Sequence, residues 1–369
     1  MTQSQTRFII YNKNTIFEPD YSDEKRPRKR ARIENEESDG LAGLFRDSQY
    51  YDSKSLDACV ILVGDTLFRV KIKTLSKLSL SLHILVDGTE ASGDYNPVRL
   101  NAEPDEFRAV LWAVHTSPDE LKHPIEDISG LKKFCSLAKF AHAFECGSQK
   151  SLALSTICDA LDHPFVKTCP SPTLHLLAET AFRCEAPILL DAIVSRWIQR
   201  IQRREAPCVP AIITADALHI LRLGGAACYA HLQEVAEHSI TVSNEGATRF
   251  HMDPKLDMSQ KVRLLTGYWS LVNYWERFRR RPLKFISCGH DACSASWERR
   301  WSVALGTRKV LCAAQVDVLG LMRIMRELLA ADQELELMES KCREQALLSL
   351  NDVRKELNDT LGDHFTNSL

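Results

Sequence analysis

Two short apolar segments on either side of a Gly-Asp pair at residues 64 and 65 restrict the fold more than any other feature. Residues 57–63 are rich in β-branched side chains, and residues 66–70 alternate apolar and polar side chains. Two such runs joined by a tight glycine-containing turn are typical of a β-hairpin. The sequence therefore predicts a strand, a turn and a second strand directly after a polar first segment.

The residues that follow predict helices and one more short strand. Residues 74–85 have the apolar content of a short helix, and residues 96–100 read as a third strand. Pro104 stands where a helix begins, because its missing N–H is not needed there. One apolar face of that helix is formed by Phe107, Val110, Leu111 and Val114. The predicted order is strand, strand, helix, strand, helix.

Three pieces of this region carry a resemblance to a known family. They are VGDTLFRV at 63–70, NPVRL at 96–100 and EPDEFRAVLWAV at 103–114. With the apolar helices expected at 131–141 and 151–161, residues 51–165 resemble the BTB/POZ domains abundant in mushroom-forming fungi, the basidiomycete type. The resemblance implies an α+β fold, a short β-sheet flanked by helices, whose function is protein–protein interaction.

Some positions depart from the pattern of that family. Lys71 and Ile72 stand where the family usually has His and a basic residue, and Ala58, beside Asp57, occupies the position of a frequent acidic residue. The family's Ser-Pro-Val-Phe pattern is replaced by Leu-Ser-Leu-His at 80–83. That segment usually shapes the dimer interface, so the resemblance leaves open whether this chain forms a homodimer.

Beyond residue 165 the apolar spacing is close to 3.6 and predicts an all-α region. Residues 166–305 form the first part, which more faintly resembles the paired helices that follow the BTB domain in these fungal proteins. We expect Gly224 and Gly225 to stop a helix. The apolar positions expected in two earlier helices are Leu174, Leu176, Leu177, Ala181, Ile188, Leu189, Ala192, Ile193, Trp197 and Ile201, and the arginines expected as solvated helix ends are Arg196, Arg200, Arg203 and Arg204.

Residues 306–369 predict long amphipathic helices or a helical hairpin. Apolar residues recur at spacings of three and four from Val318 to Leu357, with Asp332 interrupting the series. We expect these helices to pack back on the helical region, and a coiled-coil contact with a partner is the alternative.

The first 50 residues lack a sustained apolar period and have segregated charge, which is typical of a disordered tail. Six cations within eight positions form a dense basic run: Lys25, Arg26, Arg28, Lys29, Arg30 and Arg32. Such a run, kept non-helical by Pro27, fits the acidic groove of an import receptor and predicts a nuclear protein that could shuttle with the cytoplasm. A merely solvated charge run and a phosphate-binding arm are the alternatives.

A second basic stretch interleaves aromatic residues: Tyr274, Trp275, Arg277, Phe278, Arg279, Arg280, Arg281 and Lys284. This composition occurs in proteins that bind single-stranded nucleic acid by stacking and phosphate contacts. The same pattern arises when an amphipathic helix ends in solvated arginines. We favour the helix, which would bury Leu264, Tyr268, Leu271 and Trp275. Nucleic acid is therefore not an expected partner.

Cys288, His290 and Cys293 offer three soft ligands within six residues, a local arrangement that zinc accepts. A structural zinc site needs a fourth ligand, and Cys208, Cys228 or His251 would have to be supplied by the fold. We expect Cys293 to pack against Trp297 and Trp301, with no bound metal; zinc and a disulfide are the alternatives. The twelve cysteines are expected to be reduced and mostly buried.

Motifs that would support catalysis are not found in the sequence. It contains no GxxxxGK[ST], GxGxxG, GxSxG or HExxH pattern, and we expect neither an enzyme nor a cofactor. No apolar run approaches the length of a membrane span, and the polar first residues lack a secretory signal. We therefore expect a nuclear BTB interaction scaffold associated with transcription, with a corepressor as one class of partner. An adaptor that binds a cullin scaffold in a ubiquitin ligase is the alternative.

Overall fold

The structure is a computed structural model. It describes residues 43–51, 58–87, 92–121, 123–241, 253–283 and 291–366. Residues 44–369 form one unit, separate from residues 1–43.

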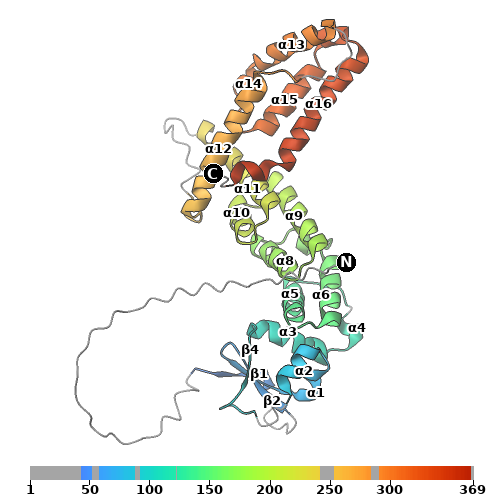
Figure 1. Ribbon diagram of the computed structural model, residues 1–369, viewed down its shortest axis with the longest axis vertical. Coiled ribbons are helices and arrows are strands. Elements are labelled where there is room, and N and C mark those ends of the chain that lie inside the picture. Colours follow the sequence, from blue (N-terminus) through green and yellow to red (C-terminus); the bar gives the residue numbers. More distant parts are fainter. Residues whose placement is uncertain are drawn as a thin grey trace, which may run out of the picture. The chain divides into compact units, whose positions relative to one another are not determined.

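A four-stranded sheet contains the predicted hairpin (Figure 1). Strands β2 (Ala58–Val63) and β3 (Thr66–Lys71) pair antiparallel, with Val63 opposite Thr66. Gly64 takes a positive φ of 60° in the turn between them, a conformation that glycine adopts without steric cost. The strand order is β1-β3-β2-β4, in which β1 (Phe45–Tyr51) and β4 (Val98–Leu100) form the two edges.

Strand β1 begins inside the segment that the sequence assigned to a polar tail. Its sequence FRDSQYY has no apolar alternation; it pairs parallel with β3, and polar side chains fix it further. The buried Asp47 carboxylate accepts a 2.7 Å hydrogen bond from Nε of Arg108 and further bonds from two backbone N–H groups. Burial alone would raise the pKa of Asp47, but these hydrogen bonds outweigh it and lower the pKa. Asp94 similarly binds Arg46 and Tyr51.

The helix predicted at residues 74–85 is two short helices. The break occurs because Ser79 leaves the helical conformation and its side chain accepts a hydrogen bond from the backbone of Leu82, as an N-cap does. The helices of this part are α1 (Ile72–Ser76), α2 (Leu80–Val86), α3 (Pro104–His115), α4 (Pro118–Leu121), α5 (Ile128–Ala143) and α6 (Gly147–Ala160). The helix predicted to start at Pro104 is confirmed.

The rest of the described chain is helical, as predicted, so the fold class is α+β. The helices are α7 (Pro164–Lys167), α8 (Ser171–Arg183), α9 (Pro187–Gln202), α10 (Cys208–Ala217), α11 (Leu221–Thr241), α12 (Met258–Arg279), α13 (Asp291–Leu305), α14 (Arg308–Leu311), α15 (Val318–Ala330) and α16 (Ser340–Asp359), with the 3₁₀ segments η1 (Gln333–Leu337) and η2 (Leu361–Phe365).

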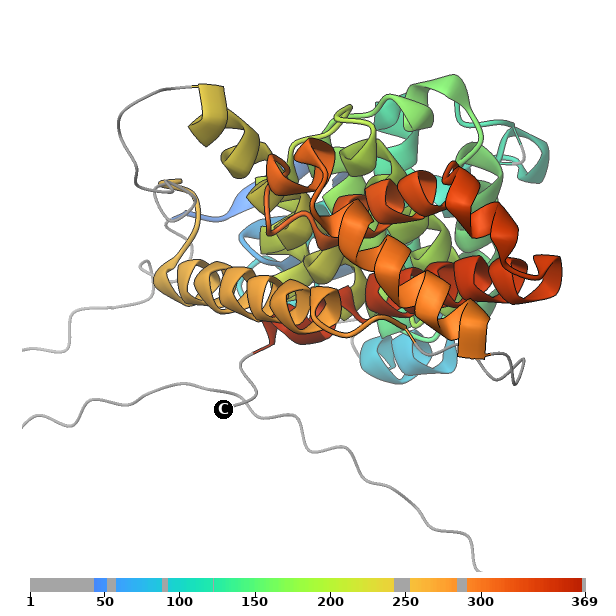
Figure 2. The same cartoon turned by 90° about the horizontal axis from the view of Figure 1, so that it is seen from above.

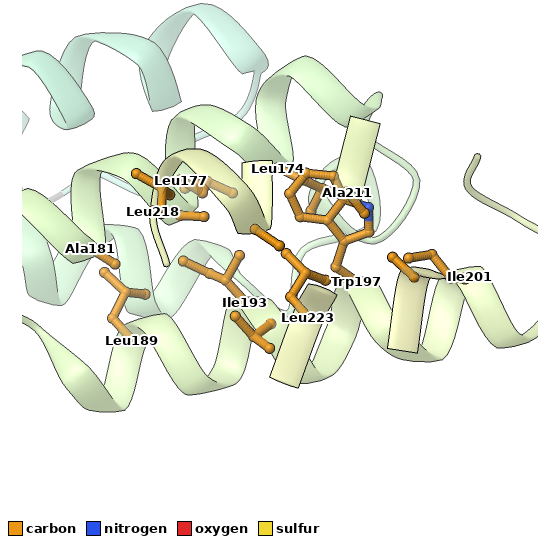
Figure 3. Packing of buried hydrophobic residues seen from close by; sticks show 14 of the residues in the cluster. Leu174, Leu177, Ala181, Leu189, Ile193, Trp197, Ile201, Ala211, Leu218 and Leu223 are labelled. Atoms are coloured by element: carbon orange, nitrogen blue, oxygen red, sulfur yellow. The ribbon is translucent and has the colours of Figure 1, made fainter. Parts of the chain in front are cut away.

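One continuous apolar core extends from the sheet into the helices. Phe107 of α3 lies 4.9 Å from the ring of Phe68 and 5.6 Å from that of Phe140. Figure 3 shows the core farther along the chain, where Trp197 and Ile193 of α9 lie among side chains of α8, α10 and α11. The predicted burial of α8 and α9 is confirmed at most positions, but Ile188 and Ala192 are exposed because they lie on the outer face of α9.

Gly224 and Gly225 lie inside α11, so the predicted helix stop is wrong. The reason for glycine at 225 is a close backbone contact with η2. A Cβ atom at Gly225 would lie 2.4 Å from the amide nitrogen of Gly362. Glycine is required at Gly267 of α12 for the same reason, since a Cβ there would lie 2.1 Å from ring atoms of Phe365. Small residues therefore allow η2 to lie against both α11 and α12.

The last helices pack on the helical region, as predicted. Helix α15 contacts α12, α13 and α16, and its buried face is Val318, Leu321, Met322, Met325 and Leu329. Asp317 caps α15 through Gly320 and also accepts 2.7 Å hydrogen bonds from Tyr229 and Gln233 of α11. Asp332, where the apolar series breaks, caps η1 and pairs with Arg300 of α13.

Candidate protein interaction surfaces

Several predicted sites lie outside the described residues. These are the basic run Lys25, Arg26, Arg28, Lys29, Arg30 and Arg32, the ligand candidates Cys288, His290 and His251, and Lys284. The roles proposed for these residues remain predictions from the sequence.

Cys293 packs where the sequence predicted. It is 7% exposed on α13, on the same face as the buried Trp297 and Trp301. The indole N–H groups of these two tryptophans donate to the carbonyl oxygens of Leu283 and Arg279, at 3.1 and 3.2 Å. Across the described ranges, no three His, Cys, Asp or Glu side chains are grouped as metal ligands.

The other two cysteines considered as zinc ligands are also buried. Burial raises the pKa of the Cys228 thiol to about 12, and burial together with Glu234 raises the pKa of Cys208 as well. Their surroundings are those of core side chains.

The basic and aromatic stretch is the end of α12, as predicted. Leu264, Leu271 and Trp275 are buried, whereas Tyr268, also predicted to be buried, is half-buried. Phe278 lies 5.9 Å from Trp275 and 5.3 Å from Trp301, measured between ring centroids. The side chains of Arg279 and Arg280 both donate to Glu276. The rings that would stack on nucleic acid bases are therefore used for packing inside the protein.

Two arginines of α9 are not solvated ends, contrary to the expectation. Arg196 donates to the carbonyl oxygen of Leu161 and to Asp162, and Arg200 donates to the carbonyl oxygen of Cys169 at 2.6 Å. The chain between α6 and α8 passes along α9, and its carbonyl groups need donors there. Arg204 does lie at the surface, where it pairs with Glu237.

Helix α2 presents an apolar ridge to solvent. Leu82 and Val86 are buried, whereas Leu80 and Ile84, four residues apart, are 71% and 68% exposed. Residues on successive turns of one helix face lie side by side. We call Leu80 and Ile84 the α2 ridge. Helix α2 contains no Asp, Glu, Lys or Arg.

A polar cavity of about 350 Å³ opens between β1, α3 and α5. Lys133 lies with its Nζ 4.5 Å from the centre of the Trp112 ring, within the range of a cation–π contact. Arg108 lines the same cavity and is held by Asp47 and Asp105. The cavity thus joins a fixed guanidinium, a lysine and an aromatic face.

Four alternating charges join the sheet-containing part to the helices that follow. Glu106 of α3 is 3.5 Å from Lys139 of α5 and 3.3 Å from Arg183 of α8, measured between nitrogen and oxygen atoms. Glu179 of α8 binds the same two cations at 3.6 Å. Glu106 is 4% exposed. We call these four residues the charge cluster; it fixes α8 against α3 and α5.

The described helices include none with the length and apolar character needed to cross a bilayer.

Comparison of the chain with protein-family models, with curated proteins and with solved structures gave no match, so the comparisons do not identify a family.

Proposed function

We propose that the chain is a protein–protein interaction scaffold whose residues 51–165 form a BTB/POZ domain, and that it acts in the nucleus in transcriptional regulation. The order hairpin, α1, α2, β4, α3, α5, α6 supports this, because it is the order that the resemblance implies. Helix α2 lies at the surface of this part, with Leu80 and Ile84 exposed. The scaffold would bind one partner there and another through residues 166–369.

The α2 ridge is the observation that carries the proposal. Leu80 and Ile84 are large apolar side chains that none of the described residues covers. A second copy of the same chain is the occupant that we propose. Because α2 carries no charged side chain, two copies can meet about a two-fold axis without like charges facing each other. Contact between the two ridges would remove both apolar pairs from water.

A test of this proposal uses copurification of two differently tagged copies of the full chain from its own cells. Purification of one tagged copy of the wild-type chain is expected to recover the differently tagged second copy together with chromatin or corepressor proteins. Leu80→Glu combined with Ile84→Glu is expected to reduce recovery of the second copy at least about tenfold, because it buries four carboxylates at one interface. Ile188→Glu is the control, since Ile188 is equally apolar and 86% exposed but lies on α9. Equal recovery with the double variant would refute the ridge as the interface.

An adaptor of a cullin-RING ubiquitin ligase is the second candidate. The charge cluster favours it, because an adaptor must hold its cullin-binding and substrate-binding parts in a fixed relation, and these charges join α3 and α5 to α8. The helical region would then be the substrate receptor. Recovery of a stoichiometric cullin in the same purification would replace the transcriptional proposal with this one.

The nuclear part of the proposal rests on residues 25–32. Replacing Lys29 and Arg30 with Ala in a fluorescently tagged full chain is expected to move most of the signal to the cytoplasm, because the import receptor loses two of its six cationic contacts. Arg203→Ala combined with Arg204→Ala removes two cations elsewhere and should leave the location unchanged. Continued nuclear retention of the Lys29 and Arg30 variant would contradict the assignment.

A further inference from the structure

Helix α12 presents a second apolar face in addition to the buried one that the sequence predicted. Met258, Val262, Leu265 and Trp269 are 75%, 46%, 46% and 66% exposed. Their spacing of four, three and four places them in one line along the helix. We call these four residues the α12 stripe. The buried residues Leu264, Leu271 and Trp275 lie on the other side of the same helix.

The stripe differs from the scattered apolar residues found on any protein surface. Single exposed apolar side chains are common, but an aligned set that includes a largely exposed tryptophan is typical of a binding surface. Figure 2 shows α12 along one edge of the helices α9 to α16. Among the described elements, η2, α11 and α15 pack against the helix and leave the stripe exposed.

The charges around the stripe indicate what kind of partner fits. From Met258 to Trp275 the helix has no carboxylate, whereas it carries Lys261 and Arg263. Arg263 pairs with Asp216, which leaves Lys261 as the cation beside the stripe. Eleven residues after Trp269, and so on the same face, lies Arg280, which is 74% exposed.

The basic character increases at the end of the helix. Arg277, Arg279, Arg280 and Arg281 follow one another closely, and Glu276 is the single carboxylate among them. Glu276 already accepts hydrogen bonds from two of these arginines. A partner that lies along the stripe and reaches this end therefore meets an excess of positive charge.

We propose that the α12 stripe is a docking site for an acidic amphipathic helix of another protein. Such a helix would place apolar residues at spacings of three and four against the stripe, and carboxylates toward Lys261, Arg277 and Arg280. A second copy of α12 fits less well, because the face it would bring carries no carboxylate apart from the occupied Glu276. The site lies outside residues 51–165 and does not depend on the function proposed for them.

The test uses the full chain and two synthetic peptides of three heptads. Both peptides have leucine at the a and d positions; one has glutamate and the other lysine at the e and g positions. Fluorescence anisotropy with labelled peptides is expected to show saturable binding of the glutamate peptide that weakens with added salt. The lysine peptide should bind at least about tenfold more weakly, because it places like charges together.

Variants separate the apolar from the charged contribution. Trp269→Ser is expected to weaken binding of the glutamate peptide at least about tenfold, as loss of an aromatic anchor does. Leu311→Ser is the matched control, since Leu311 is 65% exposed on α14. Arg277→Glu with Arg280→Glu is expected to abolish the preference for the glutamate peptide, and it provides a second test that leaves the stripe intact.

Three results would overturn the proposal. One is equal affinity for the two peptides, and another is unchanged binding by the Trp269 variant. The third is a dimer of the wild-type chain, seen by sedimentation, that Trp269→Ser dissociates and Leu80→Glu with Ile84→Glu does not. That last result would assign the stripe to a second copy of this chain. It would also distinguish failure of the proposal for the stripe from failure of the proposal for the α2 ridge.

Discussion

Gly225→Ala is expected to lower the free energy of unfolding by about 2 to 3 kcal/mol, as overpacking of a tight contact does. A Cβ atom at this position would lie 2.4 Å from the nitrogen and 2.6 Å from the Cα of Gly362. These are backbone atoms, which cannot rotate away as the end of a side chain can. Segment η2 must move, and the buried Leu361 and Phe365 then lose contacts.

The neighbouring glycine provides the control. At Gly224 an added Cβ would lie 3.4 Å from the Cβ of Ala215, an ordinary contact distance. Gly224→Ala should therefore be neutral or stabilise the protein by up to about 1 kcal/mol, because alanine is the better helix former. Urea denaturation of the two variants measures the difference. If both variants unfold at the same urea concentration, the close approach of α11 and η2 does not govern stability.

Glu106→Ala is expected to destabilise the protein by about 2 kcal/mol, since it removes one of the two counterions of the largely buried Lys139. Lys139 is 12% exposed and would keep Glu179 alone as its counterion. Arg183, 45% exposed, would turn toward water at little cost. The loss falls where α3 and α5 meet α8, so the sheet-containing part and the later helices should unfold less cooperatively.

Thermal and urea unfolding of the Glu106 variant should be compared with those of Glu237→Gln. Glu237 pairs with Arg204 at the surface, where both side chains are more than half exposed, and its loss should change stability by less than about 0.5 kcal/mol. Glu106→Ala with Lys139→Met should be less destabilising than the sum of the single changes, because the uncompensated charge is removed. Strict additivity would show that the two residues do not interact.

The spacing of apolar residues correctly predicted the segments whose structure is decided by burial of a regular apolar face. The hairpin at 57–70, the helix from Pro104 and the buried face of α12 are segments in which burial of a regular pattern decides the structure. The buried Cys293 follows from the same reasoning, because it shares a helix face with two tryptophans. In these segments the local pattern and the tertiary packing favour the same structure.

Features that depend on distant residues could not be predicted in this way. Gly225 was interpreted as a helix stop, but its small size is required by Gly362, far along the chain. Arg196 was interpreted as solvated, but it binds a carbonyl group of the chain that follows α6. Strand β1 has no apolar alternation, and its pairing with β3 together with the contact between Asp47 and Arg108 holds it in place. A single sequence contains no sign of these pairings.

The candidate surfaces also combine features that the sequence predicts with features that only the structure shows. The sequence pointed to residues 80–83 as unusual, and the structure adds that Leu80 and Ile84 form the exposed edge of α2. The α12 stripe has a helical period of its own, but period alone does not tell which of two apolar faces is buried. That choice is made by the elements packed on one side of α12, which are η2, α11 and α15, with Phe365 of η2 lying against Gly267.

The contact between Gly225 and Gly362 also bears on how the chain is made. Ribosomes add about 5–20 residues per second, so the two glycines emerge on the order of ten seconds apart. During that interval α11 and α12 are already synthesised, while η2, which fills the space beside Gly225 and Gly267, does not yet exist. The apolar walls of that space stay open to water until residue 365 has left the exit tunnel. Chaperones that bind exposed apolar segments would therefore act on this chain in the interval between synthesis of α12 and synthesis of η2.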